Sequence, residues 1–474
     1  MKPIWLLLFL VFLLSAERAR SSELPSVSHY SLDVKFLLKE EQIKVRAEMT
    51  VANTTNEPTS EIPFLLYRLL EVKSAENDKS APLNFAQMVV RDKDWPQLQM
   101  NLVRVDLKHL LKPGASTKIV LSYEGFIYGY REVMAYVRES ITEQYAFLRQ
   151  ETFSYPIIAL PDRRSRFASY NSIFTYDLRV TVPIDYTVAA GGKLIETRSE
   201  DGSTTFVYKS KIPTGQIDIA AAKFSIRKDE PAGLTIYALP GHEAGAERVL
   251  KGIKGVIAFY SRLFGETDHY QGYTVIEIPE GWGSQAPPLY ILQTAAVFEN
   301  PKKMAELYHE VGHTWNAKVK PEVQRSRYFD EAFASYFAAL ATREFEGEKA
   351  YEAALETARK SFIRSVERDK RNYETPIADY GKYEIGGLSY TKGAWSLYVL
   401  HHLLGDEGFY KVMGVFLAEF SQRGADFKDF QRTAEKVSGR DLSKFYTEWI
   451  YGVESSGLLT EQTSLSEIVS RYKQ

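Results

Sequence analysis

The sequence contains no cysteine among its 474 residues. The chain therefore has no disulfide framework and no cysteine for lipid attachment. An exported protein without disulfides fits a bacterial envelope better than a small extracellular domain held by disulfides. The chain also lacks an excess of one charge, because 59 basic and 61 acidic residues leave a formal net charge of −2, and no basic run or stripe occurs. Nucleic acid and anionic membrane surfaces are therefore not expected as partners.

Long hydrophobic runs are lacking apart from one, which covers residues 4–14. This run is shorter than the roughly 20 residues that a membrane span requires. Small residues follow it, including Ala19 and Ser21, so residues 1–21 are predicted to be a secretory signal peptide that is cleaved after Ser21. The protein is then exported to a bacterial periplasm or secreted, without a membrane span. An uncleaved N-terminal membrane anchor is the alternative.

Alternating apolar and charged residues dominate the first half of the chain. Ile43, Val45 and Ala47, for example, are interleaved with Lys44 and Arg46. A period of two is typical of antiparallel strands with one buried face. Turn-forming residues punctuate the strands. We therefore predict an all-β N-terminal domain over residues 23–227.

Helical patterns take over after residue 228. A few strands are predicted first, including residues 234–239 and 273–278. Apolar residues at helical spacing then predict a series of helices. These cover residues 245–264, 301–317, 331–345, 349–369, 389–404 and 408–420. The predicted fold class is α+β, with a mostly helical domain over residues 228–452 and a C-terminal tail over residues 453–474.

The most informative motif is His309-Glu310-Val311-Gly312-His313, in a chain that has only 8 histidines. Side chains at positions i and i+4 lie on the same face of a helix. Two imidazoles in this arrangement can bind one zinc ion, and the intervening Glu310 can act as a general base on water. The apolar residues of the segment form a stripe on the opposite side, which leaves the histidines to face a cleft.

A catalytic zinc site needs a third protein ligand and an open fourth position. Glu331 is the candidate, because it begins the next helical pattern on the side that carries small residues. Those small residues would let the two helices approach closely. The alternative is a glutamate that only complements the helix dipole. Asp330 is either an outer acceptor for a ligand histidine or an N-cap.

These two segments resemble the aminopeptidase N family of gluzincin zinc metallopeptidases. The family shows H-E-x-x-H-x-W, followed by a segment similar to L-N-E-G-F-A-S-Y; here the second segment runs from Phe329 to Tyr336. The resemblance implies one zinc ion per chain, with His309, His313 and Glu331 as its ligands and Glu310 as general base. It also implies a thermolysin-like catalytic domain. One departure is that eighteen positions separate His313 from Glu331, where the family usually has nineteen.

A second match is Ser389-Tyr390-Thr391-Lys392-Gly393-Ala394, which is similar to the family's S-Y-x-K-G-A. The resemblance implies that Tyr390 donates a hydrogen bond to the oxyanion. A phenol placed where negative charge develops stabilises the transition state more than the ground state. Tyr390 is therefore predicted to be catalytic. The family's large helical C-terminal domain is not expected, because only about twenty residues follow the end of the resemblance, and a more open cleft is predicted.

The third family motif, G-x-M-E-N, matches less well. Its glutamate binds the free α-amine of the substrate, and the corresponding residues here are Gly283, Ser284, Gln285 and Ala286. These four are predicted to bind substrate, through a glycine-rich turn that brings backbone close to a peptide. The turn has no carboxylate where the family has glutamate. The nearby residues that could supply the missing polar group are Glu280, Glu151 and Gln150.

The sequence thus predicts a zinc-dependent metallopeptidase that acts on peptides and removes their N-terminal residues. A first alternative is an endopeptidase, or a hydrolase of blocked substrates, at the same site; the missing carboxylate favours it. A second alternative is a non-catalytic protein that binds peptides or assists envelope assembly and retains a residual metal site. Glu310 and Tyr390 argue against the second alternative, because binding alone requires neither of them.

Overall fold

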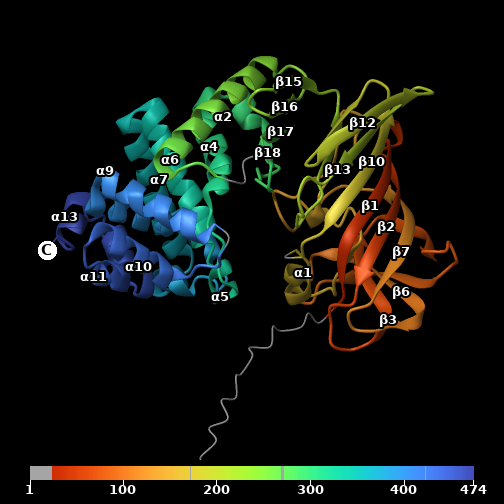
Figure 1. Cartoon of the computed structure of the whole chain (residues 1–474), viewed down its shortest axis with the longest axis horizontal. Helices are drawn as coiled ribbons and strands as arrows, with labels where there is room; N and C mark the ends of the chain where they lie inside the picture. Colours follow the sequence, from red (N-terminus) through yellow and green to blue (C-terminus); the bar gives the residue numbers. More distant parts are fainter. Residues whose placement is uncertain (1–23, 171, 268–271, 422, 474) are drawn as a thin grey trace, which may run out of the picture.

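The computed structural model describes residues 24–170, 172–267, 272–421 and 423–473, and the elements named below lie within them. Figure 1 shows a β-rich N-terminal domain and a helical domain side by side, with the small sheet of the second domain between them. Within the described residues, no helix combines the length and the apolar character that a membrane span requires. The predicted signal peptide, residues 1–21, lies outside the described residues.

The N-terminal domain is built from three sheets. The largest has the strand order β12 (Lys193–Glu200), β13 (Ser203–Lys209), β10 (Thr175–Pro183), β1 (Ser26–Leu37), β2 (Gln42–Ala52), β7 (Ser116–Phe126) and β4 (Leu70–Asn77). The second has the order β5 (Asn84–Arg91), β6 (Gln99–Leu111), β3 (Thr59–Tyr67) and β9 (Ile157–Ile158). The third has the order β11 (Thr187–Ala190), β14 (Ile219–Ala222) and β8 (Tyr145–Leu148).

The alternation predicted from the sequence is present in β2, where Ile43, Val45 and Ala47 are buried and Lys44 and Arg46 are exposed. The pairing is antiparallel with one exception: β1 and β10 run parallel, although 146 residues separate their partners His29 and Thr175. The domain also contains a short helix, α1 (Arg163–Tyr170), on the side that faces the helical domain (Figure 1).

The second domain begins with a four-stranded sheet in the order β15 (Ser225–Asp229), β16 (Leu234–Ala238), β17 (Tyr273–Ile278) and β18 (Tyr290–Thr294). The last three strands are parallel. Its helices are α2 (Glu243–Phe264), α3 (Ala295–Glu299), α4 (Met304–Gly312), α5 (Pro321–Gln324), α6 (Phe333–Glu346), α7 (Glu348–Arg368), α8 (Arg371–Glu374), α9 (Lys392–Phe420), α10 (Phe427–Ser438), α11 (Ser443–Tyr446), α12 (Glu454–Thr460) and α13 (Leu465–Ser470).

The helices follow the predicted pattern, with differences at their ends. The two helices predicted over 389–404 and 408–420 form one element, α9, that is interrupted at Gly405, whose φ of 70° lies outside the helical range. The segment predicted as a C-terminal tail forms α12 and α13, and its apolar residues Leu459 and Ile468 are fully buried. The apolar faces of these two short helices are thus part of the helical core.

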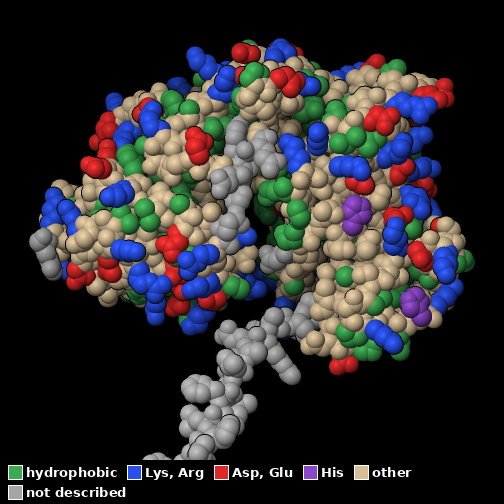
Figure 2. Space-filling model, in the orientation of Figure 1, with side chains coloured by type: hydrophobic (Ala, Val, Ile, Leu, Met, Phe, Trp, Pro, Cys, Tyr) green, Lys and Arg blue, Asp and Glu red, His purple; other side chains and the backbone are tan. Residues whose placement is uncertain are grey.

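Each domain has its own hydrophobic core, and a third cluster joins them. This cluster contains Phe147 of β8 together with Ile276 of β17 and Trp282 of the following turn. Aromatic rings dominate it: the rings of Tyr145 and Trp282 meet edge to face at 5.6 Å. Figure 2 shows the surface hollowed between the two lobes, with charges of both signs interspersed over this face. The structure therefore presents a cleft whose two walls come from different domains.

Candidate metal centre

Helix α4 carries the paired histidines. Asn300 is the N-cap of the turn that precedes α4: its side chain accepts a hydrogen bond from the backbone N–H of Lys302 at 3.0 Å, and Pro301 occupies the first helical position. This first turn is a 3-10 helix, and the α-helix begins only at Met304. The chain tightens again into a 3-10 turn at His313–Trp315, so the helix is shorter than the predicted 301–317.

Glu331 lies in a single π-helical turn, Tyr328–Ala332, that leads into α6. Such turns are rare and occur often at functional sites. α4 and α6 pack closely because small residues meet: a Cβ added to Gly312 would lie 3.2 Å from the Cα of Ala334. The close approach predicted from the small residues of this helix is therefore present. It brings Glu331 beside the two histidines.

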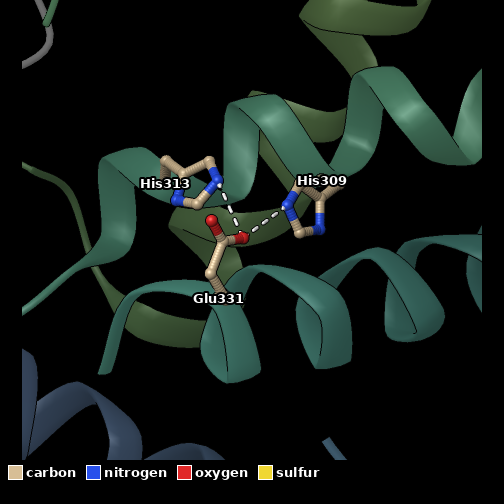
Figure 3. A group of neighbouring side chains, drawn as sticks. All are labelled: His309, His313 and Glu331. Atoms are coloured by element: carbon tan, nitrogen blue, oxygen red, sulfur yellow. Dashed lines mark hydrogen bonds and ion pairs between the residues drawn. The ribbon is translucent and has the colours of Figure 1, made fainter. Parts of the chain in front are cut away.

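The structure brings together the three predicted ligands. One ligand atom from each of His309, His313 and Glu331 lies within 4.8 Å of the other two. Oε2 of Glu331 is 3.1 Å from Nε2 of His309 and 3.6 Å from Nε2 of His313 (Figure 3). Glu331 has a side-chain exposure of 3%, against 17% and 15% for the histidines, so the carboxylate lies at the base of the group.

This donor set fits zinc. Two imidazole nitrogens and one carboxylate oxygen are the ligands of many catalytic zinc sites, and three protein ligands leave a position open for water. Among the described residues, no other group of three or more histidines, cysteines and carboxylates is close enough to hold a metal ion. The sequence motif and the converging side chains therefore point to the same place.

Asp330 orients one of the histidines from behind. Its Oδ1 lies 2.6 Å from Nδ1 of His313, which leaves Nε2 of that ring facing Glu331. Carboxylates in this position fix the orientation of a metal-binding imidazole. The N-cap residue of the π-helical turn is Arg327 and not Asp330. Of the two interpretations of Asp330, the outer acceptor for a histidine therefore agrees with the structure and the N-cap does not. Burial raises the pKa of Asp330, but His313 and Arg327 outweigh this effect and hold it well below its ordinary value.

Glu310 and Tyr390 flank the three ligands. Glu310 is 8% exposed, and burial raises the pKa of its carboxyl, against the opposing effect of the neighbouring histidines. The ring of Tyr390 stacks on His309, with ring centres 5.6 Å apart and planes 14° from parallel. Burial, and next the charge of Glu331, raise the pKa of Tyr390 well above its ordinary value. The phenol is therefore protonated at neutral pH and can donate a hydrogen bond.

The glycine-rich turn lies between β17 and β18. Gly281 and Gly283 have φ of 80° and 68°, in the region that favours glycine. Ser284 Oγ accepts hydrogen bonds from the Gln293 side chain at 3.0 Å and from the backbone N–H of Thr294 at 3.2 Å. The turn is thereby held against the strand that leads to the metal-binding helix. The backbone of Gln285 pairs with Leu292 of this strand, and its side chain contacts the N-terminal domain.

Glu151 meets the turn from the N-terminal domain. Its Oε1 accepts a hydrogen bond from Nε2 of Gln285 at 2.7 Å, across 134 residues of sequence. The other two candidates for the missing polar group are placed differently. Glu280 accepts from the backbone N–H of Ala296 at the start of α3, and Gln150 is buried. Ala286 offers no polar group and packs against the helical core. Glu151 is thus the candidate carboxylate that contacts the turn.

Arg149 anchors this arrangement and was not singled out from the sequence. Its side chain is fully buried, forms an ion pair with Glu139, and donates a hydrogen bond to the backbone oxygen of Trp282 at 2.9 Å. A buried arginine needs such partners, because an uncompensated charge is costly inside a protein. Arg149 therefore ties the strand that precedes Glu151 to the glycine-rich turn. The sequence feature that could have indicated it is an arginine directly after an apolar strand, Tyr145–Leu148.

Comparisons with known proteins match this description. The family model described as "Peptidase family M1 domain" matches residues 289–449. The protein "Probable aminopeptidase 2" of Sulfurisphaera tokodaii is 25% identical over 331 residues, which are 65% of this chain and 41% of that protein. Glutamyl aminopeptidase of Rattus norvegicus is 21% identical over 451 residues, which are 89% of this chain and 46% of that protein. The chain spans less than half the length of these two relatives.

Solved structures share the fold over nearly the whole chain. A mutant of the M1 zinc metallopeptidase of Deinococcus radiodurans, solved with a Tyr-Ser-Ala substrate, has a TM-score of 0.61 at 17% identity, and the match covers 91% of this chain and 95% of that one. A structure described as a two-domain M1 zinc metallopeptidase bound to L-tryptophan has the same TM-score and coverage. These matches confirm the predicted α+β fold, a β-rich domain followed by a helical one.

Proposed function

We propose that this chain belongs to peptidase family M1 and is a zinc-dependent metallopeptidase that removes N-terminal residues from peptides. The observation that carries the proposal is the convergence of His309, His313 and Glu331 within 4.8 Å, next to the buried Glu310 on the same helix. This arrangement supplies a metal site with an open position together with a base. We assign one zinc ion per chain to these three ligands.

The remaining groups then have distinct roles. Bound zinc would polarise the scissile carbonyl and lower the pKa of the attacking water. Glu310 takes a proton from that water and passes it to the leaving amine, as a general base and then a general acid. Tyr390 donates a hydrogen bond to the carbonyl oxygen as negative charge develops there. Its stacking on His309 supports this role, because it holds the phenol ring beside the metal site.

The N-terminal specificity is assigned to Glu151. The turn Gly283–Ala286 would hold the backbone of the substrate, and Gln285 presents the carboxylate of Glu151 to it through their 2.7 Å hydrogen bond. An ionised carboxylate makes a strong, charge-assisted hydrogen bond to a free α-ammonium group. Glu151 would thus supply from the N-terminal domain the negative charge that Gln285 and Ala286 lack.

A second candidate function is endopeptidase activity, or hydrolysis of peptides with blocked N-termini, at the same metal site. The observation that favours it is the neutral character of Gln285 and Ala286, which by themselves impose no requirement for a free amine. A purely peptide-binding protein is less well supported, because binding requires neither a buried base nor a cleft-facing phenol.

Matched peptides separate these functions. We would measure cleavage of fluorogenic peptides in pairs that differ only in acetylation of the N-terminus, with added zinc and with a chelator. The proposal expects cleavage of free-amine peptides alone, from the N-terminus, and its loss with chelator. Cleavage of both members of each pair would support the second candidate. The Glu310→Gln variant should bind zinc normally and lose nearly all turnover; a variant that retains turnover would contradict the role of Glu310.

We further propose that the chain is exported, to a bacterial periplasm or to the medium, by the signal in residues 1–21. The apolar run over residues 4–14 and the small residues after it support this. The mass of the protein recovered from cells that express the full chain tests the proposal. Cleavage after Ser21 is expected, and an intact N-terminus in a membrane fraction would instead support an uncleaved anchor.

A further inference from the structure

Arg327 stands at the metal centre in an unusual conformation. Its backbone is left-handed, with φ of 54°, and it caps the π-helical turn that carries Glu331. Left-handed backbone is unfavourable for a non-glycine residue and persists where the surrounding structure fixes it. Here the preceding residue is held firmly: the backbone oxygen of Ser326 accepts a hydrogen bond from the buried Ser389 at 2.7 Å. Arg327 is thereby fixed against the segment that ends in Tyr390.

The guanidinium of Arg327 bridges two neighbouring carboxylates. It forms an ion pair with Oε1 of Glu331, and its Nη2 lies 3.1 Å from Oδ2 of Asp330. The other oxygen of each carboxylate is turned toward a histidine: Glu331 Oε2 toward His309, and Asp330 Oδ1 toward His313. One arginine thus contacts the outer oxygens of both carboxylates, while their inner oxygens orient the two imidazoles.

The charges around the site require such a partner. Glu310, Asp330 and Glu331 contribute three negative charges within one small region. Glu310 and Glu331 are buried, and the side chain of Asp330 is 41% exposed. Like charges at short distance repel more strongly the more they are shielded from water. With neutral imidazoles, a divalent ion and one guanidinium balance these three charges. The family motif L-N-E-G-F-A-S-Y has an uncharged Asn at the position of Asp330. Asp330 therefore adds a negative charge that the motif does not contain.

We propose that Arg327 and Asp330 form a clamp that holds Glu331 and His313 in their liganding orientation independently of the metal. Arg327 is a positioning residue for the metal ligand Glu331, and Asp330 is one for His313. The clamp rests on the proposed zinc site. The clamp holds the side chains of Glu331 and His313 in place in the metal-free protein, so that zinc binding does not have to orient them. Outer contacts of this kind raise metal affinity when they fix ligands in place.

The test measures zinc affinity directly, by competition with a chromogenic chelator, on the full chain. Arg327→Met removes the guanidinium, Asp330→Asn removes the charge that it compensates, and the double variant removes both. The expected loss of affinity for Arg327→Met is about 10- to 100-fold, the range found for outer contacts of metal ligands. Because the two side chains act as a pair, the double variant should lose less than the product of the two single losses.

Two further variants separate positioning from general stability. Arg327→Lys keeps the positive charge but loses the planar guanidinium that contacts both carboxylates. It should recover part of the zinc affinity that Arg327→Met loses. Arg325→Met is the matched control: its side chain is 61% exposed, two positions away, with its guanidinium 3.9 Å from Glu384, and it should bind zinc as the unmodified protein does. Melting temperatures of the metal-free variants show whether each is folded when affinity is measured.

The outcomes are distinct for the clamp and for the proposed function. If the unmodified protein does not bind zinc, the proposed function fails. If it binds zinc and Arg327→Met binds within threefold of it, the clamp is wrong and the proposed function stands. Strictly multiplicative losses in the double variant would also overturn the clamp. Partial rescue by Arg327→Lys, together with a sub-multiplicative double variant, supports it.

Discussion

Replacing Glu151 by Gln removes a charge at the point where the two domains meet. Oε1 of Glu151 accepts from the side chain of Gln285 at 2.7 Å, and its Oε2 lies 3.6 Å from Nε of Arg149. Gln has the same length as Glu and can keep a hydrogen bond to Gln285. The substitution therefore changes the charge presented to a substrate amine far more than it changes the shape of the turn.

The magnitude follows from the environment of this carboxylate. A hydrogen bond to a charged group contributes about 1.5 to 3 kcal/mol net. Arg149 pairs with both Glu139 and Glu151, and the side chain of Glu151 is 21% exposed, so that this carboxylate can also reach a ligand. We expect a loss of about 2 kcal/mol, which corresponds to about 30-fold in kcat/KM. Because the amine is bound equally before and during the reaction, the loss should appear in KM and not in kcat.

The assay compares kcat and KM for one free-amine peptide in three proteins: the unmodified chain, Glu151→Gln and Glu280→Gln. Glu280 is the matched control, because it precedes the same turn but accepts its hydrogen bond from the backbone N–H of Ala296. We expect Glu280→Gln to change KM by less than twofold. A Glu151→Gln variant with unchanged KM would refute the assignment of the amine anchor, and a large effect of Glu280→Gln would move the anchor to that residue.

Three other predictions follow from the structure. Tyr390→Phe should keep zinc and lower kcat by about 10²- to 10³-fold, as removal of one oxyanion donor does; a reduction below about fivefold in steady-state assays would exclude that role. Gly283 has φ of 68°, and a Cβ added there would lie 3.3 Å from Tyr136, so Gly283→Ala should destabilise the turn by about 1 to 2 kcal/mol and lower kcat/KM. Gly114→Ala is the control, because Gly114 has a similar φ of 76° but open space around it; this variant should leave kcat/KM unchanged. Burial lowers the pKa of Lys392 to about 7 from an ordinary 10.5, so the unfolded chain binds more protons between these values and stability should rise with pH. Relative to Lys392→Met, the unmodified chain should gain roughly 2 kcal/mol in free energy of unfolding between pH 7 and pH 9 in denaturant titrations, and parallel curves for the two proteins would contradict this.

The sequence predicted those parts of the site that depend on local periodicity. The spacing of His309 and His313 places both on one helical face, and the small residues near Glu331 predicted the close approach that Gly312 makes possible. Alternation predicted the β-rich domain, because a half-buried strand needs it. The resemblance pointed to Glu331 and Tyr390, which lie beside His309 in the structure. A peptidase M1 family model matches residues 289–449, and the fold class that the resemblance implied is confirmed.

Other features depend on contacts that no local pattern encodes. The end of α4 at Gly312 and the π-helical turn around Glu331 are set by packing between helices, and apolar spacing does not distinguish such turns from regular helix. The left-handed backbone of Arg327 is held by a hydrogen bond from Ser389, 63 residues away from its partner. The contact of Glu151 with Gln285 crosses 134 residues and two domains, so the sequence left it as one of three alternatives.

The proposed metal site and the proposed amine anchor depend on different parts of the fold. The zinc ligands come from helices of one core, where Gly312 and Ala334 fix their separation. The amine anchor depends on contacts between domains, namely the hydrogen bond from Arg149 to Trp282 and the aromatic cluster around Trp282. A change that loosens these contacts would free the glycine-rich turn from Glu151 while the metal ligands stayed in place. The chemistry would then continue without its requirement for a free amine. On the proposed function, aminopeptidase and endopeptidase activity would thus be two settings of one site, and the contact between Glu151 and Gln285 would determine which of them applies.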